Sequence, residues 1–154
     1  EEESVGVALG QNGVVYAATG STEESNKNIG KLYALLDEGK NSVRELWNEP
    51  ISFDSSLGIP AIDSNGIIYV KTRGSGMEPG DPEIPARVYA FKDSGDHATE
   101  LWVYDLPAGE EIWWGNVVIG SDKTLYFATA TCDMSCADET ANPPALYALG
   151  EPKE

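Results

Sequence analysis

One short pattern occurs three times in this chain, and it constrains the fold more than any other feature. Its copies read ALGQNGVVYAAT at residues 8–19, AIDSNGIIYVKT at 61–72 and VIGSDKTLYFAT at 118–129. In each copy a polar turn separates two short runs rich in apolar residues. Turn residues that tolerate positive φ between two such runs predict a β-hairpin. The chain is therefore expected to contain three hairpins of the same design.

The segments that follow each hairpin also repeat. GKLYALL at 30–36 and SVRELW at 42–47 follow the first copy, and ARVYAFK at 86–92 and TELWVY at 99–104 follow the second. Only PALYAL at 144–149 follows the third. Aromatic residues recur 53 to 58 positions apart, and we expect them to pack between the repeats rather than to form a ligand cage. These residues are Tyr16, Tyr33, Trp47, Tyr69, Tyr89, Trp102, Tyr126 and Tyr147.

A repeat of this length with four strands in each unit is typical of a β-propeller blade and not of a β-sandwich. We therefore predict an all-β fold, with three four-stranded antiparallel blades of a β-propeller in a single partial domain. The predicted blades span about residues 4–48, 57–104 and 115–150, and the third lacks its outer strand.

Three blades are too few for a closed ring. Propellers typically contain four to eight blades, and an unclosed stack leaves two apolar sheet faces that soluble monomers rarely expose. The chain could be a fragment, with its remaining blades in a longer protein or in another chain. Alternatively, a further copy could complete the ring as a dimer, or copies could join into an open filament. A partner or a further copy could also supply the missing outer strand by strand addition.

The charge of the chain limits its partners. Ten Lys and Arg residues against 26 Asp and Glu residues give a formal net charge of -16. We expect no nucleic-acid partner, because phosphate binding requires clustered basic residues, and no attraction to anionic membranes. No apolar run is long enough for a membrane span, and no basic segment precedes an apolar one as in a secretion signal. The sequence opens with three Glu residues rather than with Met, so we expect a mature or excised segment. The acidic composition is typical of the solubilising surface of a secreted or salt-adapted protein.

The long loops of the predicted blades share one side, which carries most of the negative charge. Because loops on a rigid scaffold often bind ligands, this side is a candidate surface for a basic partner or for divalent cations such as calcium. A merely solvated surface explains the charge as well. The acidic loop residues are Glu23, Glu24, Glu49, Asp54, Glu78, Asp81, Glu83, Asp105, Glu110, Glu111, Asp133, Asp138 and Glu139, and the basic ones are Lys27 and Arg73. The candidate metal ligands among them are Glu78, Asp81, Asp133, Asp138 and Glu139.

The two cysteines, Cys132 and Cys136, lie four residues apart in the loop TCDMSCADET. A local disulfide is the first interpretation, and it would place the protein in an oxidising compartment. A zinc site is the alternative, but its third ligand would have to be His97 from another repeat. The chain has a single His, no nucleophile-elbow Ser and no glycine-rich phosphate loop, so nucleophilic and phosphoryl-transfer chemistry have no basis in it.

Two segments of the repeat resemble a known family. GKLYALLDEG followed by ELW, and RVYAFKDSGD followed by ELW, are similar to the PQQ-like, or quinoprotein-type, β-propeller repeat. In that repeat a G-x-[LV]-Y-A-[LF]-[DN]-x-x-[TS]-G turn leads to a strand that ends in Leu-Trp. The resemblance covers essentially the whole chain. Its motifs are specific for the repeat but not for an enzyme, because catalytic and non-catalytic propellers share this blade.

The resemblance implies one of two functions. The first is a non-catalytic extracellular, cell-surface or periplasmic propeller that serves as a structural, protein-interaction or assembly scaffold, and this is the function we expect. The alternative is a fragment of a PQQ-dependent dehydrogenase, whose family binds PQQ beside calcium and carries a disulfide between adjacent cysteines. CDMSC is not such a pair, and no catalytic or cofactor-binding residue of that family can be placed on this chain. We therefore expect no PQQ, while bound calcium stays open as a possibility for the acidic loops.

Overall fold

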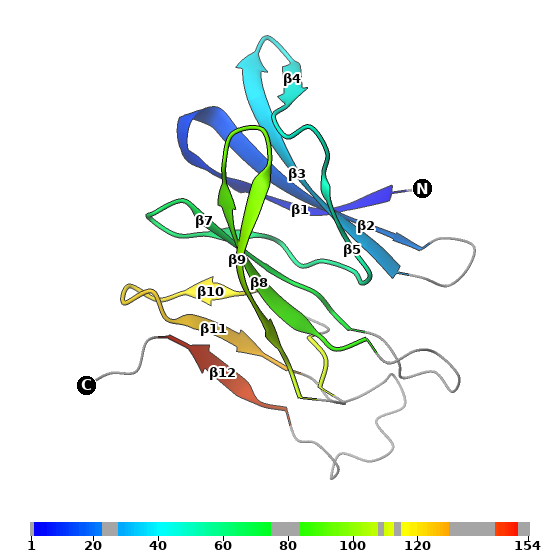
Figure 1. Cartoon of the computed structure of the whole chain (residues 1–154), viewed down its shortest axis with the longest axis vertical. Helices are drawn as coiled ribbons and strands as arrows, with labels where there is room; N and C mark the ends of the chain where they lie inside the picture. Colours follow the sequence, from blue (N-terminus) through cyan, green and yellow to red (C-terminus); the bar gives the residue numbers. More distant parts are fainter. Residues whose placement is uncertain are drawn as a thin grey trace.

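The computed structural model of the chain describes residues 2–22, 28–74, 84–107, 110–112, 115–129 and 144–150. It confirms the all-β prediction, because twelve strands form three antiparallel sheets that lie one above another in Figure 1. Within these ranges the helical structure is a single 3-10 turn, η1, at Gln11–Gly13. No helix in the described part of the chain is long and apolar enough to cross a lipid bilayer.

The first sheet contains five strands. Four follow one another in the order β1 (Glu2–Leu9), β2 (Val14–Thr22), β3 (Asn28–Gly39) and β4 (Ser42–Glu45), and β5 (Ile51–Phe53) pairs with the remaining part of the β3 edge. The ladder between β2 and β3 extends to the pair formed by Thr22 and Asn28. The polar sequence GSTEESNKNI of residues 20–29 had predicted a loop there. That prediction was wrong for residues 20–22 and 28–29, because backbone hydrogen bonds continue the ladder whatever the polarity of the side chains. Residues 23–27 lie outside the described residues.

Positive φ angles allow both tight turns of this sheet. Asn12 (φ 56°) and Gly13 (φ 79°) join β1 to β2, in agreement with the turn that their sequence predicts. Gly39, Lys40 and Asn41 have φ angles of 73°, 53° and 63° and join β3 to β4. Gly and Asn are the residues that reach this left-handed region most easily, so the turn sequence determines where the strands reverse.

The second and third sheets repeat the same order with shorter strands. The second contains β6 (Ala61–Ile62), β7 (Ile67–Lys71), β8 (Arg87–Asp93) and β9 (Ala98–Asp105). The third contains β10 (Val118–Ile119), β11 (Leu125–Ala128) and β12 (Leu146–Leu149), and no fourth strand pairs with β12 among the described residues. The strand predicted at 57–62 is regular only at its end, where β6 follows an isolated bridge between Leu57 and Thr72.

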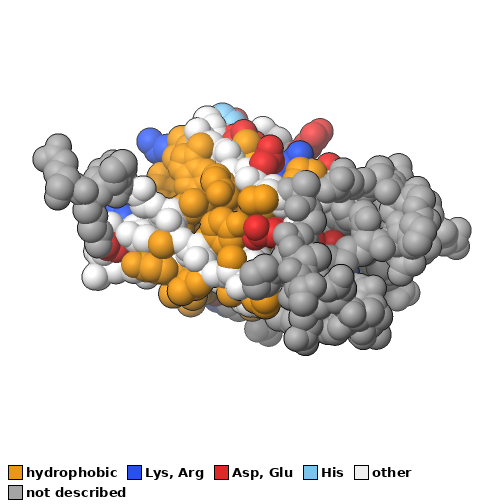
Figure 2. Space-filling view, turned by 90° about the horizontal axis from the view of Figure 1, so that it is seen from below, with side chains coloured by type: hydrophobic (Ala, Val, Ile, Leu, Met, Phe, Trp, Pro, Cys, Tyr) orange, Lys and Arg blue, Asp and Glu red, His pale blue; other side chains and the backbone are white. Residues whose placement is uncertain are grey.

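The sheets are stacked in chain order. We call the side of a sheet that points toward the C-terminal end of the stack its downstream face, and the opposite side its upstream face. One hydrophobic cluster joins the first sheet to the second, and another joins the second to the third. The first strands of the sheets also lie together, because β6 contacts both β1 and β10. Figure 2 views the β12 end of the stack, where hydrophobic side chains extend across the middle of the surface.

Candidate functional site

Matching positions of the repeat form both contacts between sheets. In the first contact the downstream face carries Tyr16, Ala18, Leu32 and Ala34, and the upstream face of the second sheet carries Ile68, Val70, Tyr89 and Phe91. In the second contact the downstream face carries Tyr69, Lys71, Val88 and Ala90, and the upstream face of the third sheet carries Leu125, Phe127, Tyr147 and Leu149. In both contacts a face with a tyrosine, an aliphatic residue and an alanine at matching positions therefore meets a face of four large apolar residues.

In the first contact, the half-buried carboxylate of Asp93, at the end of β8, binds two residues of the first repeat. Tyr16 Oη donates a 2.6 Å hydrogen bond to Asp93 Oδ2, and Trp47 Nε1 donates a 3.1 Å hydrogen bond to Asp93 Oδ1. Burial and the hydrogen bond to Asp93 raise the pKa of Tyr16 far above its ordinary value. Burial by itself would raise the pKa of the Asp93 carboxyl, but the hydrogen bonds from Tyr16, Gly95 and Trp47 hold it below its ordinary value. The pair is thus a neutral phenol bound to an ionised carboxylate.

The matching place in the second contact is open. Trp102 corresponds to Trp47 in the repeat, yet Trp102 is 38% exposed and Trp47 only 3%. Trp102 contacts Tyr69, with ring centroids 5.9 Å apart, and both line an open cleft of about 1110 Å³ between the second and third sheets. Gly150, the last residue that the structure describes, forms part of the wall of this cleft.

The other repeated aromatic residues are buried to different degrees. Tyr89 is buried and stacks on Phe91, with ring centroids 5.8 Å apart. Tyr147 is half-buried and stacks on Phe127 at 5.1 Å. Tyr33 is half-buried on the upstream face of the first sheet, and Tyr126 is exposed on the downstream face of the third. The repeat therefore places two of its tyrosines at the two ends of the stack.

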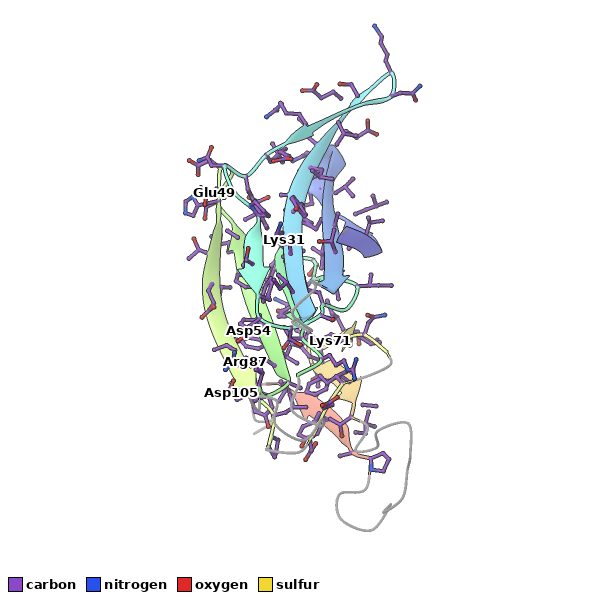
Figure 3. The ribbon with its side chains drawn as sticks, turned by 90° about the vertical axis from the view of Figure 1, so that its right-hand side faces the viewer. Lys31, Glu49, Asp54, Lys71, Arg87 and Asp105 are labelled. Carbon is purple, nitrogen blue, oxygen red and sulfur yellow. The ribbon has the colours of Figure 1, made fainter. Side chains whose placement is uncertain are left out.

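Arg87 binds two of the predicted acidic loop residues. Its Nε lies 2.7 Å from Asp105 Oδ1, and its Nη1 lies 3.8 Å from Asp54 Oδ2. The three side chains lie together in Figure 3. The hydrogen bond to Asp105 is the main reason that the pKa of Arg87 rises above its ordinary value. These charges join the connector that contains Asp54 to the second sheet.

Two further acidic loop residues are also engaged within the chain. Glu111 is buried, and its Oε2 lies 3.4 Å from Arg73 Nε. Tyr147 Oη donates a 2.7 Å hydrogen bond to Glu110 Oε2. Burial, followed by the hydrogen bond to Glu110, raises the pKa of Tyr147 to about 12. Asp54, Asp105, Glu110 and Glu111 therefore each contact another side chain of the chain.

Glu49 lies far along the sheets from Asp54 and Asp105 (Figure 3). The backbone N–H of Asn48 donates a 2.9 Å hydrogen bond to the carbonyl of Asp96, in the turn between β8 and β9. In Figure 3, Glu49 lies at this turn end, far from Asp54 and Asp105. The prediction that Glu49 lies on the same side as the other acidic loop residues was therefore wrong, because the connector formed by residues 48–56 runs along the length of the sheets.

The candidate metal ligands and both cysteines lie outside the described residues. This holds for Glu78, Asp81, Asp133, Asp138 and Glu139, for Cys132 and Cys136, and for the loop residues Glu23, Glu24, Lys27 and Glu83. In the ranges that the structure describes, no three His, Cys, Asp or Glu side chains come close enough together to hold a metal ion. His97 lies in the exposed turn after β8, with Nδ1 2.7 Å from Asp96 Oδ1.

Lys71 is a buried charged residue that sequence reasoning missed. It lies on the downstream face of the second sheet, where the other repeats carry Ala18 and Ala128. Its Nζ donates a 2.6 Å hydrogen bond to the carbonyl of Ile112, and its place is marked in Figure 3. Burial and the nearby charge of Arg73 lower the pKa of Lys71 to about 8. A lysine at an alanine position of the repeat was the signal that could have revealed it.

Both ends of the stack expose apolar side chains. On the downstream face of the third sheet, Leu146 is 76% exposed and Val118 is 63% exposed. On the upstream face of the first sheet, Leu9 is 78% exposed, and Val7 beside it is also exposed. Apolar side chains gathered on one face in this way are typical of a surface that binds another protein.

We compared the chain with protein-family models, with curated proteins and with solved structures, and none of the three comparisons found a match.

Proposed function

We propose that this protein is a β-propeller module of the PQQ-like repeat type that acts as a non-catalytic assembly scaffold outside the cytoplasm. In this proposal the three sheets are blades, and the strands β1, β6 and β10 are their inner strands. Partners bind the exposed faces at the two ends of the stack. The observation that carries the proposal is the downstream face of the third sheet, which exposes side chains at positions that the other two sheets bury.

The uniform direction of the stack supports the blade arrangement. Each sheet begins with the strand that contacts its neighbour's first strand, and each contact joins a downstream face to an upstream face. Radial repetition of one sheet with inner strands side by side is the geometry of a propeller. The same positions therefore recur in the same contacts along the stack.

The exposure of Leu146 supports a scaffold role for the end faces. Leu32 and Val88, which occupy its position in the first two sheets, are fully buried. Full burial of such a side chain stabilises a protein by about 1.5 to 3 kcal/mol relative to an exposed one. A partner that covers this face would gain that free energy at several positions at once.

The described polar contacts support a rigid scaffold. Arg87 joins a connector to the second sheet, and Lys71 joins the segment around Ile112 to the same sheet. Asp93 joins the first sheet to the second. Each of these charges is used to hold one part of the stack to another.

The proposal is tested against quinoprotein chemistry. The purified chain is incubated with PQQ, calcium and an electron-acceptor dye, with alcohols or sugars as substrates. We expect no substrate-dependent reduction of the dye and no change in melting temperature on addition of PQQ. Quinone-dependent oxidation of an alcohol or a sugar would overturn the non-catalytic scaffold, whatever the oligomeric state of the chain.

A further inference from the structure

We infer that the partner at the exposed end faces is a second copy of this chain, bound head to tail. The upstream face of the first sheet of one copy packs on the downstream face of the third sheet of the other. This inference rests on the proposed scaffold role and specifies its partner. It follows from the two contacts between sheets, each of which joins a downstream face to an upstream face. Among the described residues, one further face of each kind lies at the ends of the stack with no sheet packed on it.

The downstream half of the contact is present on the third sheet. Its Tyr126, Ala128, Leu146 and Ala148 share one face, because Tyr126 pairs with Ala148 and Ala128 pairs with Leu146. The same positions are Tyr16, Ala18, Leu32 and Ala34 in the first sheet, where all four are buried under the second sheet. The third sheet therefore carries a tyrosine, an aliphatic residue and an alanine at the positions that receive an upstream face twice within the chain, and it has Ala128 where the second sheet has Lys71.

The upstream half of the contact is present on the first sheet. Its Val15 and Leu35 form one pair, Ala17 and Tyr33 form another, and Leu9 lies beside them on β1. The positions of Leu9 in the other sheets are Ile62 and Ile119, and each packs against the cluster that joins its sheet to the preceding one. Leu9, by contrast, is exposed. Among the described residues, no sheet covers this upstream face of the first sheet, which carries Ala17 where the other upstream faces carry Val70 and Phe127.

The hydrogen bond between Tyr16 and Asp93 predicts a matching hydrogen bond between two copies of the chain. Asp37 occupies the position of Asp93 in the repeat, and Tyr126 occupies that of Tyr16. The two turns share one contact, because Asp37 Oδ1 accepts a 2.8 Å hydrogen bond from Gly39 N–H, as Asp93 Oδ1 does from Gly95 N–H. Asp37 and Tyr126 are both exposed, so the Tyr126 hydroxyl of one copy can donate to Asp37 of the other.

The two contacts between sheets favour head-to-tail binding of a second copy over binding through two identical faces. Both contacts between sheets join a downstream face to an upstream face, and among the described residues one further face of each kind has no sheet packed on it. Two copies joined at both ends would form a ring of six sheets, within the range of four to eight blades that propellers use. Each copy carries a net charge of -16, so association should strengthen as salt screens the repulsion.

The first experiment measures mass in solution by sedimentation equilibrium at moderate salt. We expect a dimer of about 33 kDa, twice the 16.5 kDa of one chain, with a concentration-dependent monomer. Leu146→Arg and Leu9→Arg each change a highly exposed side chain at one end face, so both variants should fold and should lose association. Leu101→Arg is the matched control, because Leu101 is exposed on the middle sheet and lies on neither end face.

The second experiment distinguishes head-to-tail contact from the pairing of like faces. Leu146→Arg keeps an intact upstream face, and Leu9→Arg keeps an intact downstream face, so an equimolar mixture should recover one contact and form a heterodimer. Tyr126→Phe should raise the dissociation constant by about tenfold or more, because it removes a hydrogen bond to a charged group. Far-UV circular dichroism and thermal unfolding show that each variant is folded.

A monomer of wild-type chain at high concentration and high salt would overturn the inference, and so would a mixture of the two arginine variants that stays monomeric. Equal loss of association in Leu101→Arg would also overturn it. A monomeric chain that shows no quinone-dependent oxidation would leave the scaffold proposal standing with an unlike partner. The two proposals therefore fail in different assays.

Discussion

The hydroxyl of Tyr16 on β2 donates a 2.6 Å hydrogen bond to the carboxylate of Asp93, 77 residues further along the chain in the next sheet. The indole of Trp47 donates to the same carboxylate, with its ring 5.8 Å from that of Tyr16. Each of these residues comes from a repeated position of the sequence. The contact between sheets thus combines apolar packing with one directional polar contact, which fixes how far one sheet is displaced along the other.

Replacement of Asp93 by Asn should lower the free energy of unfolding by about 1 to 2 kcal/mol, because the half-buried hydrogen bonds lose a charged acceptor. Chemical denaturation measures this change. Asp96→Asn, in the same turn, is the control and should leave the free energy of unfolding nearly unchanged, because the Asp96 side chain is exposed. Equal effects of the two substitutions would contradict a specific role for Asp93.

The free energy of unfolding should fall as the pH rises above 10. In the unfolded chain Tyr16 ionises near its ordinary pKa of 10.0, while in the folded protein burial and Asp93 raise this pKa and keep the proton bound. The folded state then binds more protons than the unfolded state, so higher pH favours unfolding. Tyr16→Phe should show a shallower decline in denaturation experiments between pH 10 and 12. An unchanged decline would contradict the bond to Asp93.

Lys71 should have the opposite effect over a lower pH range. Its pKa is about 8 in the folded protein and ordinarily 10.5, so between these values the unfolded chain binds more protons. The contribution of Lys71 to stability should therefore grow as the pH rises from 8 to 10. Lys71→Met should remove this gain, whereas Lys92→Met, which removes an exposed lysine of β8, should keep it. A gain that persists in Lys71→Met would show that other groups cause it.

Gly74→Ala should cost at least about 2 kcal/mol of stability, because it adds a clash to backbone strain. Gly74 has φ 86°, and a Cβ there would lie 2.8 Å from the backbone nitrogen of Ala86. The N–H of Gly74 also donates a 3.0 Å hydrogen bond to the buried Ser55 hydroxyl.

Gly39→Ala is the matched control for this substitution. Gly39 has φ 73°, but no atom lies within 4 Å of the place of its Cβ. It should therefore show only the strain of a left-handed residue, about 1 to 2 kcal/mol. If both variants unfold at the same denaturant concentration, the close approach at Gly74 is unimportant.

The all-β class and most strands could be predicted from the repeat, because turns such as Asn12–Gly13 and alternating side chains are local signals. The extension of β2 to Thr22 and of β3 from Asn28 could not, because backbone pairing there does not depend on apolar side chains. The position of β5 was also missed. Its three residues pair with the edge of β3 and follow the buried Trp47 in the chain. The burial of Trp47 depends on packing between sheets, which is not a local signal.

The candidate site was harder to predict than the fold. Trp47 and Trp102 have the same place in the sequence repeat but differ in exposure, because burial depends on the neighbouring sheet and not on the repeat itself. Glu49 and Asp54 belong to one connector but lie at opposite ends of the sheets. Only the alignment of the repeats could have pointed to the exposed faces. It matches the exposed Tyr126 and Leu146 with Tyr16 and Leu32, which are buried in the first sheet.

Cross-linking between copies tests the head-to-tail contact most directly. In chains with Cys132→Ser and Cys136→Ser, one variant carries Asp37→Cys and the other carries Tyr126→Cys, and the mixture is treated with a short bifunctional maleimide. Tyr16→Cys with Asp93→Cys in one chain calibrates the reach of the reagent, because this pair has the same spacing within the stack. We predict a cross-linked dimer in the mixture and little or none with either variant alone. Efficient internal cross-linking of the calibration chain without a cross-linked dimer in the mixture would contradict the account.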